Sequence, residues 1–143
     1  MIVAYSALIE QDVKDILEPI VDRYLFLLPG WLKRIEISFM VPTIGGSESS
    51  AATTCTDKNY RWANVCINGT FLLSDAEERR KVIVHEFLHI ALSNAIDYAI
   101  RTFEDLDSDN PICAHATREL NSIHEQGIQD IAYAIIENDL RRN

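Results

Sequence analysis

Residues 82–92, VIVHEFLHIAL, place two histidines four positions apart, with a glutamate directly after the first. If this stretch is helical, His85 and His89 leave the same face of the helix and can bind one metal ion together. Zinc suits such a pair, because it accepts nitrogen ligands in tetrahedral geometry and keeps one position open for water in catalytic sites. The spacing therefore predicts a zinc site.

Glu86 can supply the chemistry that such a site needs. It lies about 100° around the helix from His85, so its carboxylate falls beside the open position of the metal and not on the ion. Zinc lowers the pKa of its bound water to about 7. Glu86 can take the proton as this water attacks a carbonyl and deliver it to the leaving amine. Hydrolysis of a peptide bond requires His85, Glu86 and His89 together.

The alternative is that both histidines only form hydrogen bonds within a core helix. The complete H-E-x-x-H pattern arises by chance in about one chain in a few hundred at ordinary residue frequencies. The surrounding residues are mostly apolar, and leaving His85, Glu86 and His89 without partners there would cost on the order of several kcal/mol. The pattern therefore favours the metal site.

Zinc needs a third protein ligand, and the stretch after His89 has neither the Gly nor the third His that follow the motif in some families. The ligand must come from the last helix or from the loop before it. On a helical projection of residues 119–138, His124 lies near the centre of the apolar face and Glu125 at its border. The projection places two further acidic residues on the far side, Glu119 and Glu137.

The apolar face of this projection consists of Leu120, Ile123, Ile128, Ile131 and Ile135. His115, near the start of the helix, also stays a candidate ligand. The projection does not choose between His124 and Glu125.

Four segments of the chain, in this order, resemble a known family: LLPGWLKRIEI, RWANVCI, VIVHEFLHIAL and HEQGIQDIAYAI. The chain resembles the zincins of the gluzincin kind and, more narrowly, the small metallopeptidases encoded by bacteriophages and prophages. The resemblance covers most of the chain. It implies an α+β, zincin-like metallopeptidase domain with a small twisted sheet packed on an active-site helix and a C-terminal helix.

The resemblance also implies that Glu125 is the third zinc ligand, beside His85 and His89. Such families usually have an acid four positions beyond this ligand, which orients a ligand histidine. Here Gln129 stands at that position. Gln can still accept a hydrogen bond, so we expect the histidine to be oriented but the metal affinity to be lower.

Zincins generally bind substrate along an edge strand, so residues 60–68, YRWANVCIN, are the expected platform on which a peptide adds as another strand. Trp62 and Asn64 would then face the cleft or solvent, or else pack against the preceding loop. A residue that stabilises the oxyanion is also expected. Three residues are candidates for that role, His115, His124 and Tyr133.

Hydrophobic periodicity predicts the elements that must position these residues. They are a helix over 7–28, a strand over 34–41, a long loop over 42–58, a strand over 60–68, a helix from near Asp75 to about residue 100, and a helix over 114–140. Pro19 either kinks the first helix or opens its second segment. Ser74 and Glu77 have the spacing of a capping box. Residues 104–111 are acidic and are expected to form a solvated loop.

Composition limits the class of protein. The 143 residues, 48% of them apolar and 24% charged, predict a single globular domain over 1–143. A net charge of −9, with 13 basic residues against 22 acidic ones, argues against nucleic acid as a partner. No apolar run is long enough to span a membrane, and the first residues do not have the pattern of a secretory signal. We therefore expect a cytoplasmic protein, in a bacterial host if a phage encodes it.

These expectations combine into a zinc-dependent peptidase that acts on a peptide or protein substrate through Glu86. The alternative is a non-catalytic zinc-binding protein of zincin fold that serves as an interaction module for phage or host proteins. A purely structural zinc would not need Glu86, which is not a ligand and is costly to bury. Its presence favours the enzyme.

Overall fold

The computed structural model describes residues 1–40, 51–107 and 110–141 and shows an α+β protein. Its residues group into two compact units, an N-terminal unit, Met1–Ile90, and a C-terminal unit, Ala91–Asn143. The N-terminal unit contains the sheet, and the C-terminal unit is helical. The α+β class is confirmed, and a single domain over 1–143 stays a prediction.

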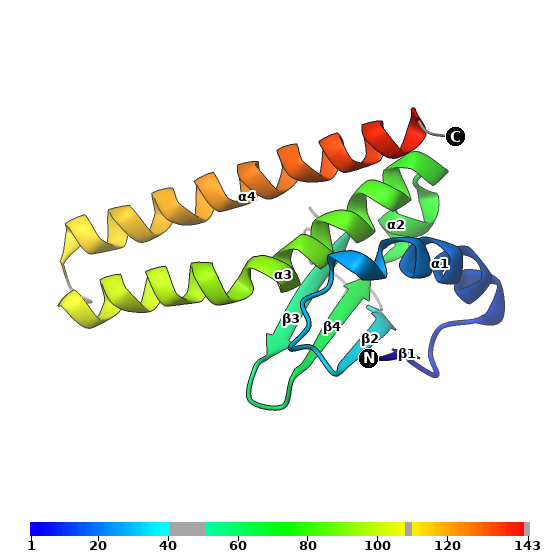
Figure 1. The fold of residues 1–143 in the computed structure, drawn as a ribbon, viewed down its shortest axis with the longest axis horizontal. Coiled ribbons are helices and arrows are strands. Elements are labelled where there is room, and N and C mark those ends of the chain that lie inside the picture. Colours follow the sequence, from blue (N-terminus) through cyan, green and yellow to red (C-terminus); the bar gives the residue numbers. More distant parts are fainter. Residues whose placement is uncertain (41–50, 108–109, 142–143) are drawn as a thin grey trace. The chain divides into compact units, whose positions relative to one another are not determined.

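A mixed four-stranded sheet forms the frame of the N-terminal unit, with the strand order β1-β2-β4-β3 (Figure 1). Its strands are β1 (Ile2–Tyr5), β2 (Arg34–Phe39), β3 (Ala52–Asp57) and β4 (Trp62–Ile67). The first three in spatial order, β1, β2 and β4, run parallel, and β3 pairs antiparallel with β4.

The two predicted strands are confirmed as β2 and β4, and their alternation places one face in the core. The side chains of this face are fully buried, at 0% exposure: Ile35, Ile37, Ala63, Val65 and Ile67. The register pairs Ile37 of β2 with Val65 of β4. Period-2 patterning was sufficient here because each strand has one buried and one more accessible face.

The predicted loop over 42–58 is wrong for its last part, where residues 52–57 form β3. Three of these six residues are threonines, which are β-branched and favour strands, and their pairing with β4 is a long-range contact that local pattern does not reveal. Residues 42–50 of the same prediction lie outside the described residues. The short strand β1 was not predicted either, because four residues are too few for a clear alternation.

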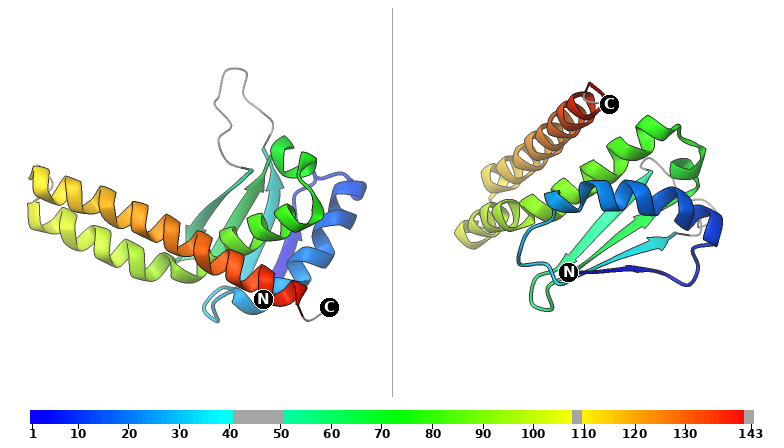
Figure 2. Two further views of the ribbon diagram at one scale, coloured as in Figure 1. Left: turned by 90° about the horizontal axis from the view of Figure 1, so that it is seen from above. Right: turned by 45° about the vertical axis from the view of Figure 1, so that its right-hand side comes forward.

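Helix α1 (Gln11–Tyr24) lies between β1 and β2 in the sequence and is followed by a 3₁₀ turn, η1 (Leu25–Leu27). Helix α3 (Ala76–Asp107) follows β4 after a short helix, α2 (Gly69–Leu73). Figure 2 shows α1 and the first part of α3 on one face of the sheet. The helical side chains at 0–1% exposure are Leu17, Val21, Tyr24, Phe71, Ile83, Val84, Phe87 and Ile90. They complete the core over the buried face of the strands.

The first helix begins later than predicted, at Gln11 instead of residue 7, because the preceding residues connect β1 to α1. Pro19 lies inside α1, which continues to Tyr24. Pro19 therefore does not open a separate segment, and the end of helical structure at Leu27 agrees with the prediction.

Asp75 caps the N-terminus of α3. Its Oδ1 accepts hydrogen bonds from the backbone N–H groups of Glu78 at 2.8 Å and Glu77 at 2.9 Å. These bonds, with that from Glu78 as the larger cause, lower the pKa of Asp75. Ser74, the predicted cap, instead donates to the Thr70 carbonyl at 2.9 Å. The helix begins where expected, but the prediction of Ser74 as its capping residue was wrong.

The C-terminal unit consists of the later part of α3 and the whole of α4 (Pro111–Leu140). The predicted acidic loop is wrong for residues 104–107, which continue α3, and residues 108–109 lie outside the described residues. Asn110 caps α4 through its side chain, which accepts from the Ile112 N–H at 2.9 Å. Among the described residues, no helix is long and apolar enough to cross a membrane.

The buried face of α4 differs from the predicted one. Its members at 1% exposure are Ile128, Ala132 and Ile136. Two residues of the predicted face are open to solvent, Ile123 at 67% and Ile131 at 44% exposure. The projection counted large apolar residues, whereas a small residue, Ala132, lies at the centre of the observed face.

The Tyr5 hydroxyl, at the end of β1, is buried and makes no hydrogen bond with the described residues. Burial, followed by the negative charges of Glu18 and Asp22, raises the pKa of Tyr5 from 10.0 to about 12. The folded chain therefore keeps a proton that the unfolded chain has already lost. The protonated, buried Tyr5 contributes to the free energy of unfolding, and this contribution is fully present below about pH 10 and is lost as the pH rises through about 12.

We expect Tyr5→Phe to remove this part of the alkaline loss of stability. Urea unfolding at a series of pH values between about 10 and about 12 measures it. The free energy of unfolding should fall more steeply with pH in the wild type than in the variant. Equal slopes would show that Tyr5 titrates alike in both states.

Candidate metal centre

The first part of α3 holds the H-E-x-x-H motif within the N-terminal unit. Within and around the motif, α3 buries five apolar residues at no more than 7% exposure: Ile83, Val84, Phe87, Leu88 and Ile90. His85 and His89 are half-buried, whereas Glu86 is only 6% exposed. The apolar contacts fix this stretch of helix, and with it the directions in which the three polar side chains leave it.

The two imidazole rings converge as the spacing predicts. The Nε2 atoms of His85 and His89 lie 3.0 Å apart, and the ring centroids lie 4.7 Å apart with an interplanar angle of 73°. Nitrogens that bind tetrahedral zinc at about 2.0–2.1 Å lie about 3.3 Å from each other. The pair therefore fits two ligands of one zinc ion after a shift of a few tenths of an ångström. Without metal, the same distance fits a hydrogen bond between the rings.

Glu86 points toward the sheet, where its carboxylate meets a threonine of β3. The Thr54 hydroxyl donates a hydrogen bond to Glu86 Oε2 at 2.6 Å. A short O–H···O⁻ distance of this kind is typical of charge-assisted hydrogen bonds. Glu86 is thus a buried residue whose carboxylate accepts a hydrogen bond from a defined donor.

Sequence reasoning missed Thr54, because this residue lies in the segment that was assigned to a loop. A signal was present in the alternation of Ala52, Thr54 and Thr56, which share one face of β3 and are buried or half-buried. Thr53 and Cys55, between them, are exposed. This period-2 pattern could have identified both the strand and the side chains that face α3.

The remaining candidate residues all lie on α4, in the C-terminal unit. Glu125 and His115 are exposed, His124 is half-buried, and Tyr133 is 45% exposed. Consecutive residues of a helix point about 100° apart, so Glu125 and His124 cannot approach a metal from the same direction. The third ligand and the oxyanion-stabilising residue stay predictions. So does the effect of Gln129.

The expected substrate platform is wrong, because β4 lies inside the sheet between β2 and β3. Its backbone groups are paired on both sides, so no peptide can add to it as a further strand. The side chain of Asn64 accepts a hydrogen bond from the Ser38 hydroxyl of β2 at 3.0 Å. In the described sheet, the edge strands are β1 and β3.

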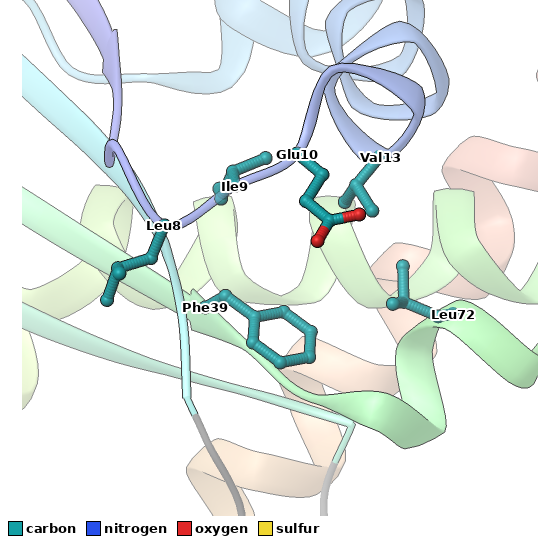
Figure 3. Close-up of a pocket in the computed structure, with 6 residues that line it drawn as sticks. All are labelled: Leu8, Ile9, Glu10, Val13, Phe39 and Leu72. Atoms are coloured by element: carbon teal, nitrogen blue, oxygen red, sulfur yellow. The ribbon is translucent and has the colours of Figure 1, made fainter.

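A cavity of about 260 Å³ lies elsewhere in the N-terminal unit, between the start of α1, the end of β2 and α2 (Figure 3). Five apolar side chains and one carboxylate line it: Leu8, Ile9, Val13, Phe39, Leu72 and Glu10. None of these residues belongs to the motif, and the volume is below that of a typical small-molecule site. The cavity does not change the location of the candidate site.

Comparison with known proteins does not assign the chain to a family. No protein-family model matches the sequence, and no curated protein or solved structure matches the chain.

Proposed function

We propose that this protein is a zinc-dependent peptidase of zincin-like fold, with His85, His89 and Glu125 as metal ligands and Glu86 as the general base. The observation that carries the proposal is the geometry of the motif. Two imidazole nitrogens lie 3.0 Å apart on one helix, and Glu86, the residue after the first histidine, is only 6% exposed. Glu125 enters through the resemblance to gluzincins and through its position on the last helix.

In the proposed reaction, the metal and Glu86 have different roles. When bound, zinc supplies a Lewis acid that polarises the peptide carbonyl and lowers the pKa of water to about 7. Glu86 accepts a proton from the attacking water and later donates it to the leaving amine. Its burial favours this role, because a carboxylate with few water contacts interacts strongly with a single positioned water.

Burial of Glu86 also argues for catalysis over a structural metal site. Two histidines and a third ligand would hold zinc without it, and an acidic side chain inside an apolar helix face costs free energy. The Thr54 hydroxyl offsets part of this cost. A buried glutamate that directly follows the first of two converging histidines is what peptide hydrolysis by this motif requires.

The edge strand β3 is the better platform for an extended peptide. One side of β3 pairs with β4, and β3 is an edge strand of the described sheet, so its other side could accept a further strand. Thr54 of this strand contacts the Glu86 carboxylate. A peptide added along β3 would therefore run close to the general base, with backbone pairing that does not depend on side-chain identity.

Metal content is the direct test. We expect about one zinc per chain in untagged protein purified without chelator, and loss of most of it in His89→Ala, measured by mass spectrometry. Glu119→Ala, which removes an exposed side chain of α4 that is not a candidate ligand, is the control and should keep its zinc. A folded wild-type protein that refuses added zinc would contradict the proposal.

Cleavage separates the enzyme from its alternative. The zinc-loaded wild type is expected to cleave members of a library of internally quenched peptides. Stoichiometric zinc without cleavage would instead support a non-catalytic zinc protein of the same fold that binds phage or host proteins.

A further inference from the structure

We infer that Thr54 is a positioning residue that holds the general base Glu86 in its working orientation from the edge strand β3. This inference rests on the proposed function and names a residue outside the H-E-x-x-H motif. Its basis is a contact between two residues of the N-terminal unit, 32 positions apart in the sequence.

The hydroxyl proton of Thr54 has one clear acceptor. Thr54 Oγ1 lies 2.6 Å from Glu86 Oε2 and 3.5 Å from the backbone carbonyl oxygen of Glu86. A hydroxyl donates one proton, and the shorter contact to a charged acceptor is much the stronger of the two. Thr54 therefore donates its proton to the carboxylate of Glu86 and limits the orientations that this carboxylate can take.

The donor is held more firmly than the group that it orients. Thr54 pairs with Val65 of β4, whose side chain is at 0% exposure on the same face of the sheet. A β-branched side chain in a strand has few rotamers, whereas a glutamate has three rotatable side-chain bonds. A rigid hydroxyl thus limits the orientations of a flexible carboxylate.

The position of Thr54 on an edge strand adds a second consequence. A peptide paired with β3 has its backbone at a fixed spacing from this strand, about 4.8 Å in a sheet. The same strand then sets the location of both the substrate and the base. A displacement of about 1 Å between reacting groups can reduce the rate by about 100-fold. Holding the substrate and Glu86 from the same strand therefore affects kcat more than substrate binding.

The test compares three variants of β3 in the full-length zinc-loaded protein. Thr54→Val removes the hydroxyl but keeps the shape, and Thr54→Ser keeps the hydroxyl. Thr56→Val is the matched control, since Thr56 is half-buried on the same face of the same strand. With the best peptide from the library, we expect Thr54→Val to lower kcat at least about tenfold and to change KM by less than about twofold. Thr54→Ser should recover most of kcat, and Thr56→Val should resemble the wild type.

A second measurement does not depend on turnover. Acetohydroxamic acid chelates zinc through its two oxygens and transfers its hydroxyl proton to a nearby base, so its affinity reports the orientation of Glu86. We expect Thr54→Val to weaken its binding by about the same factor as kcat, at full zinc content, and Thr54→Ser to restore it.

The outcomes separate this inference from the proposed function. If the wild type is active and Thr54→Val keeps kcat and hydroxamate affinity, the role of Thr54 alone is overturned. The same holds if Thr54→Ser does not recover the kcat that Thr54→Val loses, or if Thr54→Val loses zinc. Thr54-dependent hydroxamate binding without any peptide cleavage would support the positioning and overturn the peptidase. A wild type that neither binds hydroxamate nor cleaves peptides would overturn both.

Discussion

Glu86→Gln is expected to abolish peptide hydrolysis while zinc content and thermal stability stay close to wild type. Gln has nearly the same shape as Glu, and its carbonyl oxygen can still accept the hydrogen bond from Thr54. It has no carboxylate to take a proton from water, so the general-base step is lost. The measurement is kcat/KM on the best library peptide, together with metal analysis and a thermal melt of the same sample.

Glu119→Gln is the control for this experiment, because it makes the same chemical change at an exposed position of α4. Its activity should equal that of the wild type. If Glu86→Gln keeps more than about a hundredth of the wild-type activity, Glu86 is not the base. If it loses zinc or unfolds, Glu86 holds the site together and the loss of activity has a structural cause.

Glu125→Ala is expected to release zinc, whereas His124→Ala is expected to reduce stability more than metal content. Removing one of three protein ligands leaves two histidines, which cannot keep the ion against dilution. His124 is half-buried on α4, so its truncation removes packing contacts. Zinc stoichiometry and the melting temperature of both variants, measured on one preparation each, give the comparison.

Glu119→Ala serves as the matched control, since it removes an exposed carboxylate from the same helix. It should keep both zinc and stability. If His124→Ala releases zinc and Glu125→Ala keeps it, then His124 is the ligand and the carry-over from the gluzincins is wrong at this position. If both keep zinc, His115 becomes the candidate.

The sequence by itself determined the elements and residues that depend on local spacing. Helical periodicity predicted the existence of α1, α3 and α4, although their ends moved by several residues. Period-2 alternation predicted β2 and β4, with Ile37 and Val65 buried as expected. The i, i+4 spacing alone was enough to bring the His85 and His89 rings together, because a helix fixes the relation between positions so close in sequence.

Only the tertiary structure decided the features that depend on pairing between distant segments. The sheet order leaves β3 at an edge and β4 inside, and no local pattern distinguishes an edge strand from a central one. Thr54 reaches Glu86 across 32 positions for the same reason. The buried face of α4 centres on Ala132, whose small side chain gives a weak signal in a projection. Strand pairing and side-chain packing are settled by contacts that exist only once the chain has folded, whereas a motif within one helix is specified by the helix itself.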